Sequence, residues 1–195
     1  HISSKLSGTC NSALQAKELV ATECPVEVVD SEMVSMGLGL LAIKAATSAN
    51  SGEGLQQVVE EVKQLISSTH VWALFDTLKY LALGGRIGKA KALLGSILNI
   101  KPMLVVKDGE MAPAGQVRTR AKGIGALYNY VDKVIDIQDL AIVYSTTPDE
   151  AQVLADHIGA MFDKDRIRLA RLGSTLGVHA GPGALVVALR GKGIR

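Results

Sequence analysis

Short aliphatic segments alternate with helical patterns along most of this chain, and this alternation limits the folds that it can adopt. Residues 71–75, 139–145 and 184–189 are apolar runs of strand length. Residues 54–66 and 148–161 place apolar side chains on one side at helical spacing. Aromatic residues make up only 4% of the chain although 48% is hydrophobic, so the core must be mainly aliphatic. Strands that alternate with helices predict an α/β fold with layered mixed or parallel sheets and flanking helices.

Turn and cap signals define the remaining elements. Asp108-Gly109 is a hairpin-turn signal, so residues 101–107 and 110–118 are expected to pair as antiparallel strands. Thr147 fits the N-cap, and Pro148 the first turn, of the helix that follows them. Further strands are expected at residues 26–29 and 166–172, and further helices at residues 11–21, 36–46, 77–83, 89–98 and 121–134. We place a domain boundary at residues 67–69, which predicts two α/β domains, residues 1–69 and 70–195.

The net charge of +2 is unevenly distributed along the chain. Residues 1–78 carry four basic and nine acidic side chains, a balance of −5. Residues 79–122 carry nine basic and two acidic side chains, a balance of +7, and residues 123–195 carry eight of each. The basic middle segment indicates an anionic ligand or partner. A solvated lysine surface is the simpler alternative. Because the segment lacks interleaved aromatic residues and a known reader motif, nucleic-acid binding is not expected.

Cysteine use and hydropathy indicate the compartment. Cys10 and Cys24 lie without a CxxC motif or a histidine-rich neighbour, so neither a disulfide framework nor a metal site is expected. A cytoplasmic location is the default for such a chain. No apolar run approaches the roughly 18 residues that span a bilayer, so no stable membrane insertion is expected. The chain opens at His1 like the end of a strand running into a loop, and we expect a segment to be missing before it.

Two glycine-containing segments resemble nucleotide-binding motifs but lack required parts. Residues 37–42 read GLGLLA, but seven residues separate them from Val29, whereas a dinucleotide-binding turn follows its strand directly. A closely packed helix explains these glycines better. Residues 84–89 read GGRIGK, but a P-loop would need glycine at Leu83 and a hydroxyl residue at Ala90.

Three groups of residues are candidates for chemistry. Residues 173–177, GSTLG, are similar to a nucleophile elbow with Thr175 in place of serine and His179 close by, but a hydrolase triad also needs an acid. The hydroxyls of Ser7 and Thr9 are suited to a carboxylate or phosphate, and capping of the following helix is the alternative. His179 precedes Gly-Pro-Gly, a rigid loop that suits either a structural or a functional imidazole.

Five motifs occur together in the order typical of one family. Residues 2–9, ISSKLSGT, resemble the ISSxLSGT motif of the DegV family, and residues 30–41 resemble its D-S/T…S-x-G-x-G segment. Residues 78–87, LKYLALGGRI, are similar to its LxYLxxGGRI signature. Residues 101–119 resemble its KP…G…VRT hairpin, and residues 177–183, GVHAGPG, its GxHxGPG loop. The chain is therefore identified as a DegV-family member that is truncated at its N-terminus. Cys10 departs from the family, which often has tyrosine there.

The resemblance implies a fold and a function. DegV-like proteins have two α/β domains with an apolar ligand tunnel between them, which holds a long-chain fatty acid, for example of C16–C18 length. By resemblance, Ser7, Thr9 and His179 would hold the carboxylate, and Arg86 and Arg118 would form its basic surroundings. The protein would present the bound acid to a partner, a fatty acid kinase subunit. It would need no cofactor and would not be an enzyme itself.

The aliphatic lining and the competing functions can also be stated from the sequence. Candidate lining residues are Leu38, Leu40, Leu41, Ile43, Leu93, Leu94, Ile97 and Leu98, for which a place in the ordinary core is the alternative. The alternative function is a hydrolase that uses His179 with Thr175, or a phosphoryl-transfer enzyme that uses His179 with Arg86.

Overall fold

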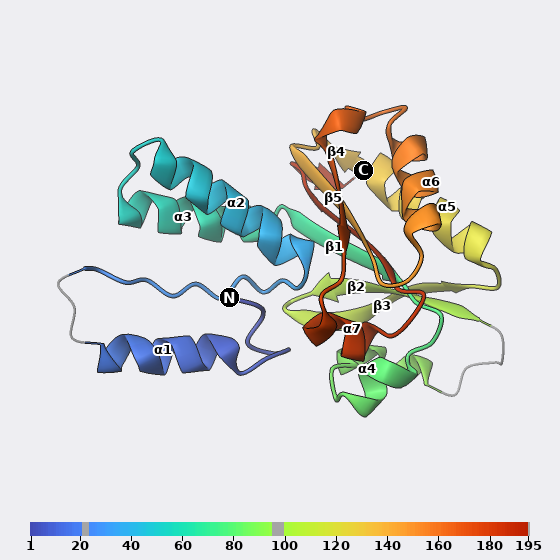
Figure 1. Cartoon of the computed structure of the whole chain (residues 1–195), viewed down its shortest axis with the longest axis horizontal. Coiled ribbons are helices and arrows are strands. Elements are labelled where there is room, and N and C mark those ends of the chain that lie inside the picture. Colours follow the sequence, from blue (N-terminus) through green and yellow to red (C-terminus); the bar gives the residue numbers. More distant parts are fainter. Residues whose placement is uncertain (21–23, 95–99, 195) are drawn as a thin grey trace.

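The computed structural model describes residues 1–20, 24–94 and 100–194, and it is built around one six-stranded sheet (Figure 1). The strand order is β3-β2-β1-β7-β5-β6. Neighbouring strands are antiparallel except β5 and β6, which run parallel. The strands are β1 (Thr69–Leu74), β2 (Lys101–Lys107), β3 (Glu110–Val117), β5 (Asp139–Tyr144), β6 (Ile167–Arg171) and β7 (Leu185–Arg190), with a separate pair β4 (Val134–Ile135) and β8 (Gly193–Ile194). The predicted α/β class with a mixed sheet is confirmed.

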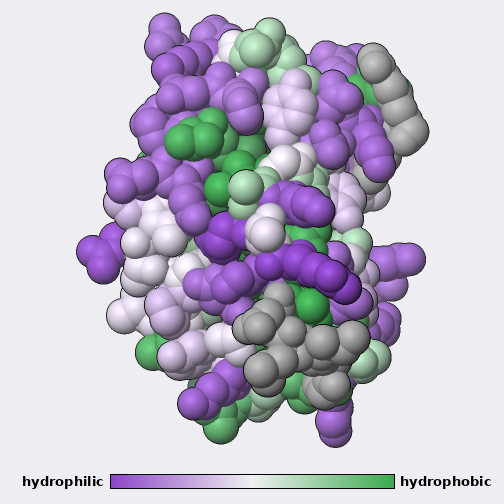
Figure 2. Space-filling model, turned by 90° about the vertical axis from the view of Figure 1, so that its right-hand side faces the viewer, coloured by the Kyte–Doolittle hydropathy of each residue, from purple (hydrophilic) through white to green (hydrophobic). Residues whose placement is uncertain are grey.

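Helices cover both faces of this sheet. Helices α5 and α6 pack on one face, α2 packs on the other, and α3 lies against α2 (Figure 1). The side of the molecule that carries α5 and α6 is mostly hydrophilic at its surface, as Figure 2 shows. The helices are α1 (Thr9–Leu19), α2 (Met36–Asn50), α3 (Leu55–Ile66), α4 (Lys79–Leu83), α5 (Arg120–Asp132), α6 (Pro148–Ile158) and α7 (Ser174–Ala180), with short 3₁₀ turns η1 (Gly88–Leu93) and η2 (Lys164–Arg166).

Strand β1 contributes side chains to two separate cores. Val71, Ala73 and Phe75 at its end face the α2 side of the sheet, whereas Trp72 and Leu74 face α5 and α6. All five are buried. A strand that is buried on both faces has a continuous apolar sequence, which is why residues 71–75 are recognisable as a strand.

The glycine at the start of α2 has a packing role. A Cβ added at Gly37 would lie 2.5 Å from Cγ2 of Val71. Only glycine therefore lets the first turn of α2 approach β1 so closely. The structure confirms a closely packed helix here rather than a dinucleotide-binding turn.

The hairpin prediction is also confirmed. Strands β2 and β3 pair in antiparallel register with Lys107 opposite Glu110. The turn residues Asp108 and Gly109 have φ values of 52° and 76°, which suit the left-handed conformations of a two-residue hairpin turn.

Several predicted details are wrong. Residues 26–29 form no strand. In the described part of the chain, the backbone hydrogen bonds beside them involve His1: His1 N donates to Val29 O at 2.8 Å, and Ser31 N donates to His1 O at 3.0 Å. The helix expected at residues 89–98 is the short turn η1, and residues 95–99 lie outside the described part, as does residue 21 at the end of the first predicted helix. The predicted N-cap position of Thr147 and the place of Pro148 in the first turn of α6 are confirmed, although the Thr147 hydroxyl has no hydrogen-bond partner among the described residues.

The predicted domain boundary at residues 67–69 lies where the sheet begins. The described residues before Thr69, which are residues 1–20 and 24–68, form three helices and no strand, and β1 begins at the predicted boundary. A division into residues 1–69 and 70–195, with a tunnel between the two parts, stays a prediction.

Candidate functional site

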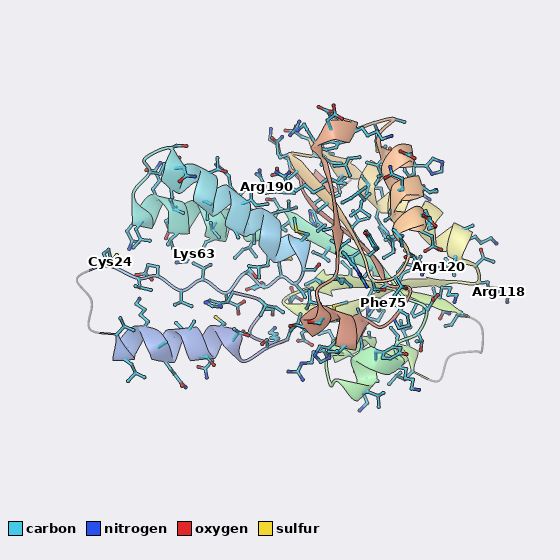
Figure 3. The ribbon with its side chains drawn as sticks, viewed as in Figure 1. Cys24, Lys63, Phe75, Arg118, Arg120 and Arg190 are labelled. Atoms are coloured by element: carbon cyan, nitrogen blue, oxygen red, sulfur yellow. The ribbon has the colours of Figure 1, made fainter. Side chains whose placement is uncertain are left out.

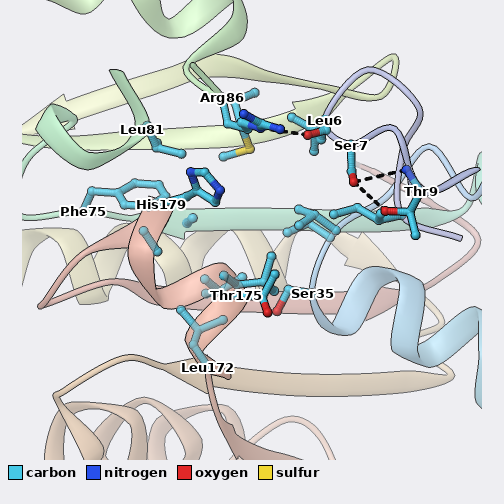
Figure 4. Close-up of a pocket in the computed structure, with 18 residues that line it drawn as sticks. Leu6, Ser7, Thr9, Ser35, Phe75, Leu81, Arg86, Leu172, Thr175 and His179 are labelled. Carbon is cyan, nitrogen blue, oxygen red and sulfur yellow. Dashed lines mark hydrogen bonds between the residues drawn. The ribbon is translucent and has the colours of Figure 1, made fainter. Parts of the chain in front are cut away.

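A cavity of about 270 Å³ lies between the N-terminal loop, the α2 side of the sheet, α4 and α7 (Figure 4). Its floor consists of Val71, Ala73 and Phe75 together with Val186 of the neighbouring strand β7. The polar or charged residues in its lining are Ser7, Thr9, Ser35, Arg86, Thr175 and His179. A mainly apolar cavity with a few polar groups is typical of a site that binds an apolar ligand with one polar end.

The hydroxyls of Ser7 and Thr9 form a pair in this cavity. Ser7 Oγ lies 2.5 Å from Thr9 Oγ1, and the backbone N–H of Thr9 donates to Ser7 Oγ at 3.3 Å (Figure 4). The N-cap of α1 is Gly8, which offers no side chain. The two hydroxyls are therefore neighbours in the cavity and neither residue is the N-cap of α1, while their role in binding a carboxylate stays a prediction.

The loop that carries Ser7 is held by two segments from far along the chain. Ser3 Oγ donates to the carbonyl of Gly109 at 2.7 Å, so the tip of the β2–β3 hairpin fixes the start of the loop. Arg86 Nε donates to the carbonyl of Leu6 at 3.0 Å, directly before Ser7. Ser3 is fully buried, which assigns it to the scaffold of the loop rather than to its polar end. The sequence alone did not predict this role of the hairpin tip.

His179 enters the cavity wall from α7. Its Nδ1 atom is buried and has no hydrogen-bond partner among the described residues. A Cβ added at Gly84 would overlap this atom, so the imidazole packs directly on the backbone at the end of α4. A buried polar atom without a partner costs about 1–3 kcal/mol.

The loop after His179 also depends on close backbone contacts. Gly181 has a φ of 72°, and a Cβ there would collide with the ring of Tyr80. The glycines of GGRI and of HAGPG therefore let α4 and α7 pack together. This packing explains why the two motifs lie at the same site although they are about ninety residues apart in the sequence.

Of the two arginines predicted for the site, the structure brings in one. Arg86 lines the cavity and donates to the backbone carbonyls of Leu6 and Gly84. Within the described residues it forms no ion pair with a carboxylate, so its charge is not neutralised. Arg118 is exposed and is not part of the cavity lining, and Figure 3 shows it at the periphery of the molecule, away from Phe75 of the cavity floor.

The predicted aliphatic lining is wrong for this cavity. Leu38 and Leu41 line a second cavity of about 280 Å³ between α2, α3 and the segment before Ser31. Of the other predicted lining residues, Leu40 is core, Ile43 and Leu94 are exposed, Leu93 packs on the core, and Ile97 and Leu98 lie outside the described residues. The apolar residues that line the cavity besides its floor are Ile2, Leu6, Val34, Leu81, Met111, Leu172, Leu176 and Ala180.

A hydrolase site in this cavity would need a nucleophile, a histidine and a group that orients the histidine. Thr175 and His179 both line the cavity and are four residues apart on α7. In the described part of the chain, however, no carboxylate or hydroxyl is hydrogen-bonded to the imidazole, so the third group that orients a catalytic histidine is lacking.

Over the described ranges, no group of three or more His, Cys, Asp and Glu side chains is arranged to hold a metal ion. Nor does any described helix have the length and apolar character needed to cross a bilayer.

Comparisons with known proteins agree with the motifs. The family model for DegV, described as "Uncharacterised protein, DegV family", matches residues 1–192. A DegV domain-containing protein of Streptomyces coelicolor is 35% identical over 98% of this chain and 69% of its own length. The structure of a DegV family protein from Thermus thermophilus, described by its fatty acid binding, matches with a TM-score of 0.87 and 31% identity over 98% of this chain and 69% of that one.

A second solved structure gives the same result with a named ligand. The DegV family protein from Ruminococcus gnavus, refined with vaccenic acid, matches with a TM-score of 0.84 and 25% identity over 96% of this chain and 69% of that one. The motifs, the family match and the shared fold lead to one conclusion: this chain belongs to the DegV family.

Proposed function

We propose that this protein binds a long-chain fatty acid, with the acyl chain in the cavity over β1 and the carboxylate at Ser7, Thr9 and His179. The observation that carries the proposal is the composition of the cavity, which has an apolar floor and a small set of hydroxyl, imidazole and guanidinium groups. The fatty acid binding described for the Thermus thermophilus relative supports the same ligand class.

The head-group chemistry follows from the hydrogen bonds already present. Ser7 and Thr9 together have two hydroxyl protons, and their mutual hydrogen bond uses one. The other proton is free to donate to a carboxylate oxygen. Arg86 has no carboxylate partner among the described residues, and a bound carboxylate would supply one. A carboxylate that leaves water needs such donors and a nearby cation, because an unpaired buried charge is costly.

The acyl chain would be held by the apolar lining. Each methylene group that is buried contributes about 0.8 kcal/mol, so an acyl chain of 16 to 18 carbons offers enough free energy to offset the cost of ordering the ligand. A tunnel between two domains, as in the expected family fold, would accommodate the rest of a chain that exceeds this cavity.

We further propose that the protein is a carrier rather than an enzyme and presents the bound acid to a fatty acid kinase subunit. The balance of +7 over residues 79–122, which includes Arg86 and Arg118, suits an acidic partner surface or an acyl phosphate. Arg118, at the periphery, would contact the partner instead of the ligand. The lack of a group that orients His179 in the described residues disfavours the alternative of a hydrolase.

Mass spectrometry of an organic extract of the purified protein tests this proposal. We expect about one fatty acid of C14–C18 length per chain, and no turnover of acyl esters by the protein alone. His179→Ala should lower the amount of lipid retained. Protein that neither retains nor binds added hexadecanoic acid would overturn the proposal, and an ester hydrolysis activity that His179→Ala abolishes would favour the enzyme.

A further inference from the structure

The loop that follows His179 contacts a group of charged side chains at the end of the sheet where β1 ends and β7 begins. Gly183 has a φ of 75°, and a Cβ added there would overlap the carboxylate of Asp76. Asp76 lies two residues after the end of β1, and its carboxylate lies against the backbone of the HAGPG loop. Lys101 Nζ at the start of β2 donates to the same carboxylate at 2.7 Å.

Arg120 joins this carboxylate to the loop. Its Nη1 atom donates to the carbonyl of Gly183 at 2.7 Å and lies 3.6 Å from Oδ1 of Asp76. Its Nε and Nη2 atoms bind the two oxygens of Glu150 on α6. One guanidinium therefore contacts a loop carbonyl and two carboxylates at once, an arrangement that needs the planar, forked donors of arginine.

Helix α7 depends on such contacts at its ends. None of its residues is fully buried, although Ala180 packs on the core, so the contacts at its two ends contribute to its position. Before the helix, Leu172 N donates to the carbonyl of Tyr144 at 2.8 Å. After the helix, the loop is held by Gly183 N, which donates to Thr146 Oγ1 at 3.0 Å, and by the guanidinium of Arg120.

We infer that Asp76, Lys101, Arg120 and Glu150 form a latch that positions His179 for a ligand carboxylate, an inference that rests on the proposed function. The latch lies at the edge of the sheet where β1 ends and β7 begins, and none of its four residues lines the cavity. It acts on the Gly181–Gly183 segment, and that segment fixes the end of α7 that carries His179. Its members are positioning residues and do not contact the ligand.

The test compares two arginines of similar exposure, Arg120 at the start of α5 and Arg190 at the end of β7. Arg120 and Arg190 both pair with carboxylates, have side chains that are 20% and 15% exposed, and lie at opposite ends of β7 (Figure 3). Arg190 pairs with Asp139 and does not touch the HAGPG loop. Arg190→Met therefore controls for the loss of a partly buried ion pair, and Arg120→Met removes the latch.

Two measurements separate positioning from folding stability. The first is the affinity for hexadecanoic acid and for 1-hexadecanol, which has the same chain length but no carboxylate. The second is the set of imidazole NMR resonances of the ligand-free protein, with the His179 signals assigned from His179→Gln. For Arg120→Met we expect at least a tenfold weaker affinity for the acid, an unchanged affinity for the alcohol, and shifted His179 resonances. For Arg190→Met we expect wild-type values in both measurements.

If Arg120→Met does not fold, Asp76→Asn provides the same test, because it keeps the shape of the side chain and removes the charge that Lys101 and Arg120 bind. Unchanged His179 resonances together with an unchanged affinity for the acid would overturn the latch. Wild-type protein that fails to prefer the acid over the alcohol would instead refute the proposed function. In that case the His179 resonances alone decide whether the latch positions the histidine.

Discussion

The imidazole of His179 lies directly on the backbone of Gly84, so that a Cβ added at Gly84 would overlap Nδ1 of the ring. Gly84 has a φ of −80°, an ordinary helical value that any residue adopts. The absence of a side chain at this position is therefore required by the contact with His179 and not by the backbone conformation.

This contact leads to a prediction for Gly84→Ala. The new methyl group must displace the imidazole, so the affinity for hexadecanoic acid should fall at least tenfold, which corresponds to about 1.4 kcal/mol. Isothermal titration calorimetry of the variant and the wild type measures the change. Gly125→Ala in α5 is the control, because nothing lies within 4 Å of its added Cβ and alanine favours a helix. An affinity for the acid that stays at the wild-type value in Gly84→Ala would contradict a head-group role for His179.

Ser7→Ala tests the hydroxyl pair. The variant loses the hydrogen bond to Thr9 and one of the two hydroxyl protons near the proposed carboxylate. A hydrogen bond to a charged group is worth about 1.5–3 kcal/mol, so the affinity for the acid should fall by about tenfold or more while that for 1-hexadecanol stays constant. Ser12→Ala serves as the control, since Ser12 Oγ donates to the carbonyl of Gly8 and, among the described residues, is not part of the cavity lining. An equal loss for acid and alcohol would indicate a general change in the loop instead.

Gly109→Ala tests the clamp between the hairpin tip and the N-terminal loop. A Cβ at Gly109 would lie 2.6 Å from Ser3 Oγ, and the residue has a φ of 76°. Gly52→Ala is a matched control, because Gly52 has a φ of 91° but no atom within 4 Å of an added Cβ. Both variants should lose about 1–2 kcal/mol of unfolding free energy from the left-handed backbone.

Gly109→Ala should lose about a further 1–3 kcal/mol, because the buried hydrogen bond of Ser3 is displaced as well. Urea unfolding of the two variants measures this difference. Equal losses in both would show that the clamp contributes nothing to stability. We also expect weaker binding of the acid by Gly109→Ala alone, since the clamp holds the loop that carries Ser7.

The sequence predicted those parts of the structure that depend on local pattern. The apolar run of β1 and the Asp108-Gly109 turn are recognisable because their side-chain periodicity and turn residues are local properties. The segment at residues 26–29 has the composition of a strand but pairs with no other strand in the described structure, and a strand forms only with a partner. Local pattern contains no information on that partner.

The sequence predicted only part of the candidate site. Ser7 and His179 meet in one cavity, as the order of the motifs indicated through the family resemblance. The sequence predicts Val71, Ala73 and Phe75 of the cavity floor only as a strand, because the segments that complete the cavity lie far away in the sequence. The leucines of α2 looked suitable as a lining because they are apolar, but Leu41 faces the second cavity instead. Apolar character predicts burial, and it does not predict which of two buried surfaces a residue joins.

His70 gives a prediction for the pH dependence of stability. Burial lowers the pKa of its imidazole below the ordinary value of 6.5, and its Nε2 atom has no hydrogen-bond partner among the described residues. The ring stacks on Trp72 with centroids 5.4 Å apart. Because the folded-state pKa is lowered, the unfolded chain binds a proton more readily. The stability is therefore fully present above pH 6.5 and is lost as the pH falls through the folded-state pKa.

Urea unfolding at pH 7.5 and pH 5.5, two values on either side of the unfolded-state pKa of about 6.5, measures this effect. The wild type should be less stable at the lower pH. His70→Phe keeps an aromatic ring beside Trp72 but does not titrate, so it should lose much of this pH dependence. His157→Gln removes an exposed imidazole and should keep the wild-type dependence.

The carboxyl groups with lowered pKa values, Asp30, Glu61 and Asp156, are protonated only at more acidic pH and do not contribute in this range. A pH dependence in His70→Phe equal to that of the wild type would assign the effect to another group.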